Sequence, residues 1–288
     1  MEASVPVSYS HRDDKSLFHL LLDRQSALDI GAFVIDGCDL SPGSAVPSDG
    51  DSRIDRALPG FFFTCGPDHI RHPEPIGAAG GGRIFPLHGS LCGTPVTWTQ
   101  MSDDPARPGC RALTDVVLAD GGKASVERVW SVDREGRSVT LSDHVTNTGG
   151  TPFAPMMMYH MNFAAALFDD DTRLSGRMMP GGGMPWRFGE GETSVVCMPA
   201  QAADEDGFAR VSLGPIQAIG GRSLHLRFAA ETLPFLQMWR CQRDGADVFS
   251  LEPASHRLAK RAELVFAGEM PLLRPGETKH YRLAFHAG

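Results

Sequence analysis

Residues 124–145, ASVERVWSVDREGRSVTLSDHV, give the strongest indication of the fold. Apolar and polar residues alternate from 124 to 132 and again from 138 to 145, as in two strands that each bury one face. The segment between them, DREG at 133–136, combines charged residues with a glycine, which is typical of a turn. The stretch therefore predicts a β-hairpin with one face in a core.

Similar signals extend in both directions from this hairpin. Residues 17–35 predict two short strands, residues 40–56 a surface loop, and FFFTC at 61–65 a buried strand. The 32 glycines and 21 prolines are spread along the chain, so turns are frequent and long helices are not expected. We therefore expect an all-β protein that forms one domain over residues 1–288, with residues 1–16 as a poorly packed N-terminal arm. Further strands are predicted at 155–163, 224–228, 235–241, 247–251, 262–266 and 280–285.

Composition excludes several classes of function. The net charge is −8 and the Lys and Arg residues are scattered, which argues against a nucleic-acid partner. No apolar stretch approaches the roughly 20 residues of a membrane helix, and the first 15 residues contain no signal-peptide core. The six cysteines form no CxxC pair and predict reduced thiols in a cytoplasmic protein. The sequence leaves a monomer and a homodimer equally open.

Two titratable residues stand out because they lie in predicted strands that are otherwise apolar, one within the strand and one at its end. His160 lies in MMMYHMNF (156–163), and Glu252 ends VFSLEP (248–253). A buried histidine or glutamate needs hydrogen-bond partners. A core histidine bonded to a backbone carbonyl and a glutamate in a structural ion pair are the simpler interpretations, and a ligand pocket is the alternative.

A third polar segment contains Asp68, His69, His72, Glu74 and His88, which invites a metal-site hypothesis. Their spacing matches no established metal motif. We expect neither a metal nor another cofactor.

Four short motifs, in order, resemble the galactose mutarotase-like superfamily, and in particular its poorly characterised branch of aldose 1-epimerase-related proteins. They are TCG at 64–66 followed by Asp68, LHG at 87–89, YHMNF at 159–163 and EP at 252–253. With weaker matches, the likeness runs from about residue 20 to the C-terminus. It implies a large antiparallel β-sandwich, the supersandwich of the galactose mutarotase type, and an isomerase that interconverts the anomers of a free sugar.

The resemblance also implies roles for individual residues. Glu252 would be the general base and His160 the general acid, protonated when the sugar binds. Ser90 stands where this branch commonly has arginine, and Arg83 is the expected substitute. The residues expected to bind the carbohydrate are His88, Arg83, Asn162, Asp68, His69, Gln237 and Trp239.

Two other functions remain open. The same acid–base pair could serve an isomerase or lyase that acts on a keto or oxidised sugar, with a metal at His69, His72 or His88. The chain could also be a carbohydrate-binding module without turnover. All these hypotheses require His160 and Glu252 to meet on one concave β surface, close enough to flank a single pyranose-sized ligand.

Overall fold

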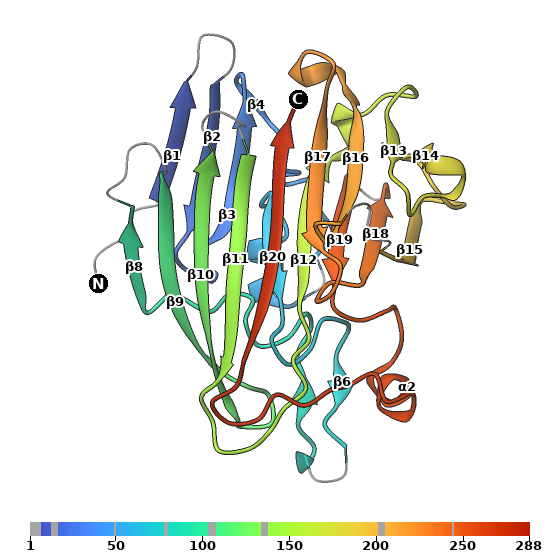
Figure 1. Ribbon diagram of the computed structural model, residues 1–288. Helices are drawn as coiled ribbons and strands as arrows, with labels where there is room; N and C mark the ends of the chain where they lie inside the picture. The colour runs from blue at the N-terminus through green and yellow to red at the C-terminus, as the bar shows by residue number, and fades with distance from the viewer. Residues whose placement is uncertain are drawn as a thin grey trace.

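The computed structural model describes residues 7–12, 17–48, 50–77, 80–102, 108–133, 138–200, 205–243 and 245–288. Two large antiparallel sheets, each of nine strands within these residues, pack face to face as a sandwich (Figure 1). The predicted all-β class is therefore confirmed. No helix in the described part of the chain is both long and apolar enough to cross a membrane.

The first sheet runs in the order β1, β2, β3, β5, β12, β19, β18, β15, with β4 paired to β3. Every neighbouring pair of strands in this sheet is antiparallel. The strand order also brings together strands that are far apart in the sequence, such as β5 and β12. The bounds are β1 Val7–Arg12, β2 Leu17–Asp23, β3 Asp29–Ile35, β4 Cys38–Asp39, β5 Phe62–Cys65, β12 Met158–Ala164, β15 Thr193–Pro199, β18 Phe235–Cys241 and β19 Val248–Ala254.

The second sheet runs in the order β14, β13, β16, β17, β20, β11, β10, β9, β8 and faces the viewer in Figure 1. A separate hairpin, β6–β7, and short helical turns complete the chain. The bounds are β8 Trp98–Met101, β9 Gly109–Val117, β10 Lys123–Asp133, β11 Ser138–Asn147, β13 Arg173–Ser175, β14 Gly183–Pro185, β16 Phe208–Ile216, β17 Arg222–Ala229, β20 Thr278–Ala287, β6 Glu74–Pro75, β7 Ile84–Phe85, α1 Ser52–Ala57, α2 Arg261–Phe266, η2 Ala165–Leu167, η3 Pro180–Gly182 and η4 Gln217–Ile219.

The predicted hairpin is present as β10 and β11, which pair from Asp133 with Ser138 to Ala124 with Asn147. Its turn at 134–137 lies outside the described residues. Two other expectations were wrong. Residues 262–266 form helix α2 rather than a strand, and α1 begins inside the expected loop at 40–56. Of the expected N-terminal arm, β1 pairs with β2, whereas residues 1–6 and 13–16 lie outside the described residues.

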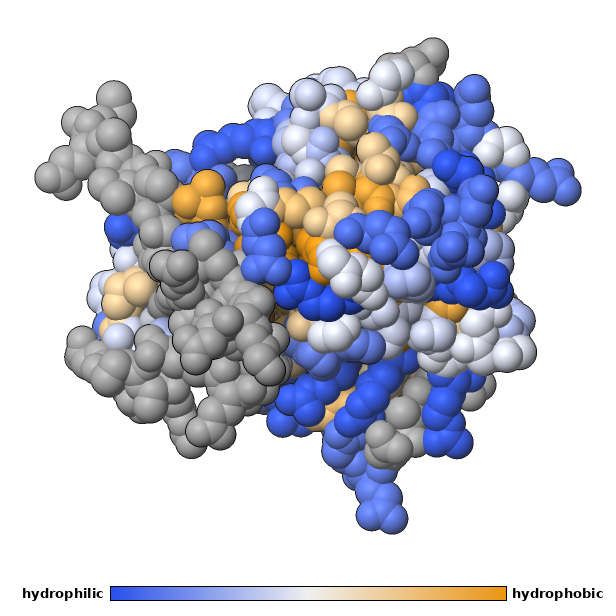
Figure 2. All heavy atoms as spheres, turned by 90° about the horizontal axis from the view of Figure 1, so that it is seen from above, coloured by the Kyte–Doolittle hydropathy of each residue, from blue (hydrophilic) through white to orange (hydrophobic). Residues whose placement is uncertain are grey.

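The main hydrophobic core fills the space between the sheets and takes alternate residues from every long strand. A smaller cluster lies on the other face of the first sheet, where α1, α2 and the loop at 87–92 contact it. Viewed from above, apolar side chains lie along the middle of this end of the molecule, with polar ones around them (Figure 2).

A buried ion network connects the two sheets. The Arg128 guanidinium on β10 donates to both carboxylate oxygens of Asp143 on β11, at 2.9 and 2.7 Å, and to Asp29 on β3 at 2.6 Å. Thr64 on β5 and Tyr159 on β12 complete it, through bonds to Arg128 and to Asp143. The Arg128 side chain is 1% exposed. The polar groups of the network therefore have one another, and not water, as hydrogen-bond partners.

We expect Arg128→Met to destabilise the protein by about 3–5 kcal/mol, because it leaves two carboxylates buried without their cation. The measurement is the free energy of unfolding in urea. Arg111→Met, on the neighbouring strand β9, removes an exposed pair with Glu127 and should cost less than about 1 kcal/mol. Equal losses in the two variants would contradict the importance of the network.

Candidate functional site

The candidate site is one row of side chains across five adjacent strands of the first sheet. The strand registers place His160 on β12 beside Phe63 on β5 and opposite Glu252 on β19. Gln237 on β18 is paired with Glu252, and Cys197 on β15 is paired with Gln237. Because neighbouring residues of a strand face opposite ways, all five point away from the core that holds Tyr159 and Met161.

The next row on the same face supports the first. Asn162 is paired with Ser250, and Ser250 with Trp239. Asn162 donates through Nδ2 to the carbonyls of Leu58 and Gly60, at 2.9 and 3.1 Å. Since both amide hydrogens are used there, its Oδ1 is an acceptor, and it lies 2.5 Å from His160 Nδ1. His160 Nδ1 must therefore carry a hydrogen.

The other imidazole nitrogen of His160 contacts Glu252. His160 Nε2 lies 3.0 Å from Glu252 Oε1. With Nδ1 already protonated, the contact between Nε2 and Oε1 holds a single proton. On Nε2 this proton gives an imidazolium and a carboxylate, and on Oε1 it gives a neutral imidazole and a carboxylic acid. The pair is thus a buried dyad that shares one proton.

Burial decides which form is preferred here. Desolvation lowers the pKa of His160 to about 3, and the hydrogen bond with Asn162 opposes this only in part. Desolvation also raises the pKa of Glu252 to about 7, against hydrogen bonds donated by Ser250 and Gln237. Both shifts favour the uncharged pair. In the protein without sugar we therefore expect a neutral His160, whereas the protonated His160 implied by the resemblance concerns the sugar-bound state and stays a prediction.

Glu252 is held in place by neutral donors. Ser250 Oγ donates to Oε1 and Gln237 Nε2 donates to Oε2, both at 2.5 Å. These bonds fix the orientation of the carboxyl group without adding a positive charge. Burial therefore keeps the pKa of Glu252 raised to about 7, near neutral pH, which suits proton transfer.

Aromatic rings surround His160. Phe63 stacks on its imidazole with centroids 4.6 Å apart, while His88 and Trp239 contact it edge to face at 5.8 and 5.9 Å. Desolvation, and then the neighbouring His160, lower the pKa of His88 to about 3, so His88 is neutral. The dyad therefore lies among aromatic rings, and the histidine that contacts it, His88, is neutral.

His88 reaches this position through a constrained loop. Arg53 of α1 donates to the carbonyls of Leu87, Gly89 and Cys92, which holds the loop against the sheet. His88 has a φ of +58° and Gly89 a φ of +83°. A Cβ on Gly89 would lie 2.2 Å from the His69 carbonyl oxygen, so glycine is required here by backbone packing and not by approach to a ligand.

Three residues expected to bind the sugar have other contacts. The Asp68 carboxylate accepts hydrogen bonds from Ser90 and from the Ala119 backbone and is buried. His69 is buried, bonds the His72 carbonyl and stacks on Phe85. Arg83 is exposed and donates to the Gly80 carbonyl. Asp68 and His69 thus support the loop, and none of these recorded contacts joins the three to the dyad.

Arg71 is a candidate that the sequence reasoning missed. Its Nη1 is buried and has no hydrogen-bond partner among the described residues. Burial raises the pKa of Cys197, and the charges of Arg71 and Arg257 lower it in part, so both guanidinium groups act on the Cys197 end of the row. The backbone carbonyl of Arg71 accepts from His88 N, which ties it to the same loop. A buried guanidinium hydrogen without an acceptor marks a place where a ligand oxygen would fit.

The dyad itself is almost enclosed. The side chains of His160 and Glu252 are 5% and 1% exposed, whereas Gln237, Trp239, His88 and Arg71 are half-exposed. His160 and Glu252 meet on one sheet face as expected, but at 3.0 Å they do not flank a pyranose-sized space. No group of three or more potential metal ligands occurs in the part of the chain that is described.

Comparisons with solved structures place the fold. The chain resembles a candidate aldose 1-epimerase from Klebsiella pneumoniae, with a TM-score of 0.77 and 15% identity over 98% of this chain and 79% of that one. It also resembles a galactose mutarotase-like protein from Clostridium acetobutylicum, with a TM-score of 0.64 and 10% identity over 98% of both chains. A galactose 1-epimerase from Lactobacillus acidophilus gives 0.59 and 10% over 99% of both.

The fold is therefore the antiparallel sandwich of galactose mutarotase-like proteins, as the motifs implied. Within this class, the chain belongs to the family described as domain of unknown function DUF4432, which matches residues 11–180 and 188–287. None of the proteins with curated functions matches the sequence.

We expect the His160 side chain at pH 7 to be neutral and protonated on Nδ1, because Asn162 offers only an acceptor there. The measurement is the pair of ¹⁵N imidazole chemical shifts of His160. Asn162→Ala removes the acceptor and should reduce the Nδ1–H population. An Nε2–H tautomer in the native protein, or no change in the variant, would contradict the assignment.

Proposed function

We propose that this protein interconverts the anomers of an uncharged aldose by acid–base opening of the ring. The observation that carries the proposal is the buried, one-proton dyad of His160 and Glu252 in a sandwich of the mutarotase-like class. Ring opening of a hemiacetal needs one proton removed from O1 and one delivered to the ring oxygen. A dyad with a single proton supplies both functions and returns to its starting state.

The proton balance follows directly. In the charged form of the dyad, the Glu252 carboxylate takes the O1 proton while the His160 imidazolium protonates the ring oxygen as the C1–O5 bond breaks. The open-chain aldehyde then faces a neutral imidazole and a carboxylic acid. After rotation about C1–C2, Glu252 returns its proton to O1 and His160 takes the proton from O5 as the ring closes. The two tautomers of the dyad thus correspond to the closed and the open sugar.

The sugar displaces the direct contact between the two side chains. The O1 hydroxyl of the sugar then replaces His160 as the partner of Glu252, and the ring oxygen replaces Glu252 as the partner of His160. Burial in this row excludes water, which strengthens each hydrogen bond to the developing charges. Without sugar the dyad is uncharged, which avoids burying two charges. The charged form is needed only when the sugar supplies hydrogen bonds to it.

Half-exposed neighbours provide the contacts that would hold the sugar. Trp239 presents an apolar ring surface suited to sugar C–H groups, and Gln237 places its amide beside Glu252. Arg71 has a buried donor available for a hydroxyl, and His88 borders the dyad from the loop. These four residues would select the substrate, whereas His160 and Glu252 transfer the protons.

Glu252→Gln and His160→Ala should each reduce anomer exchange by about 10²–10⁴, because each removes one of the two proton-transfer groups. The measurement is magnetisation-transfer NMR over a panel of aldoses, with circular dichroism as the test of folding. His280→Ala, which changes an exposed histidine on the second sheet, is the matched control and should leave exchange unchanged.

Two outcomes would contradict this function. Exchange at the native rate in both dyad variants would exclude the assigned roles. Binding of sugars by the native protein without any acceleration of exchange would instead indicate a carbohydrate-binding module.

The rate should also depend on pH with a definite sign. Since the pKa of Glu252 is raised to about 7, the dyad keeps its proton below pH 7 and loses it above. We therefore expect kcat/KM to be level near pH 6 and to fall about tenfold per unit well above pH 7. A rate that rises from pH 7 to pH 9 would mean that the ionised dyad is the active form.

A further inference from the structure

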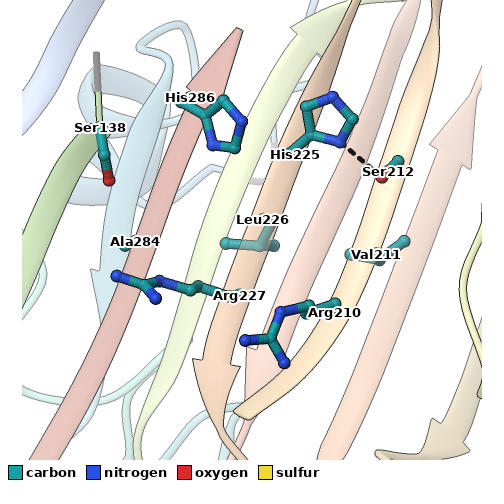
Figure 3. A pocket seen from close by; sticks show the side chains of 9 residues that line it. All are labelled: Ser138, Arg210, Val211, Ser212, His225, Leu226, Arg227, Ala284 and His286. Carbon is teal, nitrogen blue, oxygen red and sulfur yellow. Dashed lines mark hydrogen bonds between the residues drawn. The ribbon is translucent and has the colours of Figure 1, made fainter. Parts of the chain in front are cut away.

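The outer face of the second sheet carries a second polar hollow, on the opposite side of the sandwich from the dyad. Its cavity has a volume of about 370 Å³. Strands β16, β17, β20 and β11 contribute Arg210, Arg227, His225, His286 and Ser138 to it (Figure 3). Ala284 forms its floor, because this small residue stands opposite Arg227 in the register of β17 and β20.

Positive charge gathers around this hollow. The guanidinium groups of Arg227 and Arg282 lie over the same ring, that of Phe208, at 5.3 and 5.2 Å from its centroid. Arg210 lies beside Arg227 in the row of paired strand residues. The protein as a whole has a net charge of −8, so three arginines on one small area run against its composition.

One carboxylate is recorded among these groups. Asp206 pairs with Arg210, and its pKa is lowered first by the hydrogen bond from Arg210 and least by the charge of Arg227. Within the described residues, neither Arg227 nor Arg282 forms a hydrogen bond or an ion pair with an acid.

Two histidines extend the same positive side of the hollow. The rings of His225 and His286 stack with centroids 4.8 Å apart, and Ser212 holds His225 through a 2.7 Å contact to Nδ1. Desolvation, then His225 and Arg227, lower the pKa of His286. Stacked imidazoles beside a guanidinium repel further positive charge and would be stabilised by an anion.

We propose that this hollow binds a doubly charged oxyanion, such as phosphate or the phosphoryl group of a small metabolite. The guanidinium groups of Arg210 and Arg227 present planar sets of N–H donors. Such donors match the oxygens of this anion better than they match a chloride ion. Arg210 and Arg227 line the hollow itself, so their guanidinium groups face a bound anion directly. The proposal concerns a site on the second sheet and does not depend on the sugar chemistry of the first.

The test is isothermal titration calorimetry with inorganic phosphate, with a hexose 6-phosphate and with the unphosphorylated hexose, at low salt. We expect saturable binding of inorganic phosphate, and a hexose phosphate that binds more tightly would identify the phosphoryl group of a larger molecule as the natural ligand. Arg227→Gln should weaken phosphate binding at least about tenfold, since it removes a charge-assisted donor. Arg210→Gln provides a second variant with the same expectation.

Arg173→Gln is the matched control, because Arg173 is exposed on the same sheet face but does not line the hollow. It should bind phosphate as the native protein does. The proposal is overturned if phosphate does not bind at millimolar concentration, if sodium chloride at equal ionic strength gives the same heat, or if Arg227→Gln and Arg173→Gln weaken binding equally. Anomer exchange should be native in all three variants, so failure here is separate from failure of the proposed function.

Discussion

The Arg128 network is the constraint on which the rest of the structure depends. It connects β10 and β11 of one sheet to β3, β5 and β12 of the other, so it fixes how the two sheets lie on each other. Buried ion pairs add little net stability, but they penalise every arrangement that leaves one member unpaired. Because Tyr159 is held inward by Asp143, strand periodicity turns His160 and Asn162 outward. The position of the dyad is in this sense a consequence of the core.

Desolvation and charge attraction compete at the dyad, and desolvation is the stronger effect. The resemblance implied an imidazolium at His160 when the sugar binds. Among the residues that the structure describes, no arginine or lysine pairs with Glu252, and Ser250, Gln237 and Asn162 supply only neutral hydrogen bonds. Under these conditions the uncharged pair costs less to bury. Proton position within the dyad then becomes sensitive to a ligand that offers or withdraws a single hydrogen bond.

Much of the fold follows from local pattern. The β10–β11 hairpin, the pair β2 and β3, and the buried β5 are all recoverable from residue alternation and turn residues. Helix α2 was missed because its short apolar run fits a strand equally well without its tertiary contacts. The roles of Asp68 and Arg71 could not be predicted, since they depend on how a loop folds back on the sheet. Arg53, which holds that loop through carbonyl bonds, has no sequence signature for such a role.

The two outer faces of the sandwich have opposite electrostatic character, and this bears on substrate choice. The dyad row has no net charge in its preferred form and is almost enclosed, so it cannot repay the desolvation of a charged group. An uncharged sugar avoids that cost, and the cations that act on the row, Arg71 and Arg257, do so at its Cys197 end. On the second sheet, arginines gather around a hollow that is open to solvent. The outer face of the second sheet therefore favours anionic ligands, whereas the dyad on the first sheet favours an uncharged sugar. The core lies between these two sites.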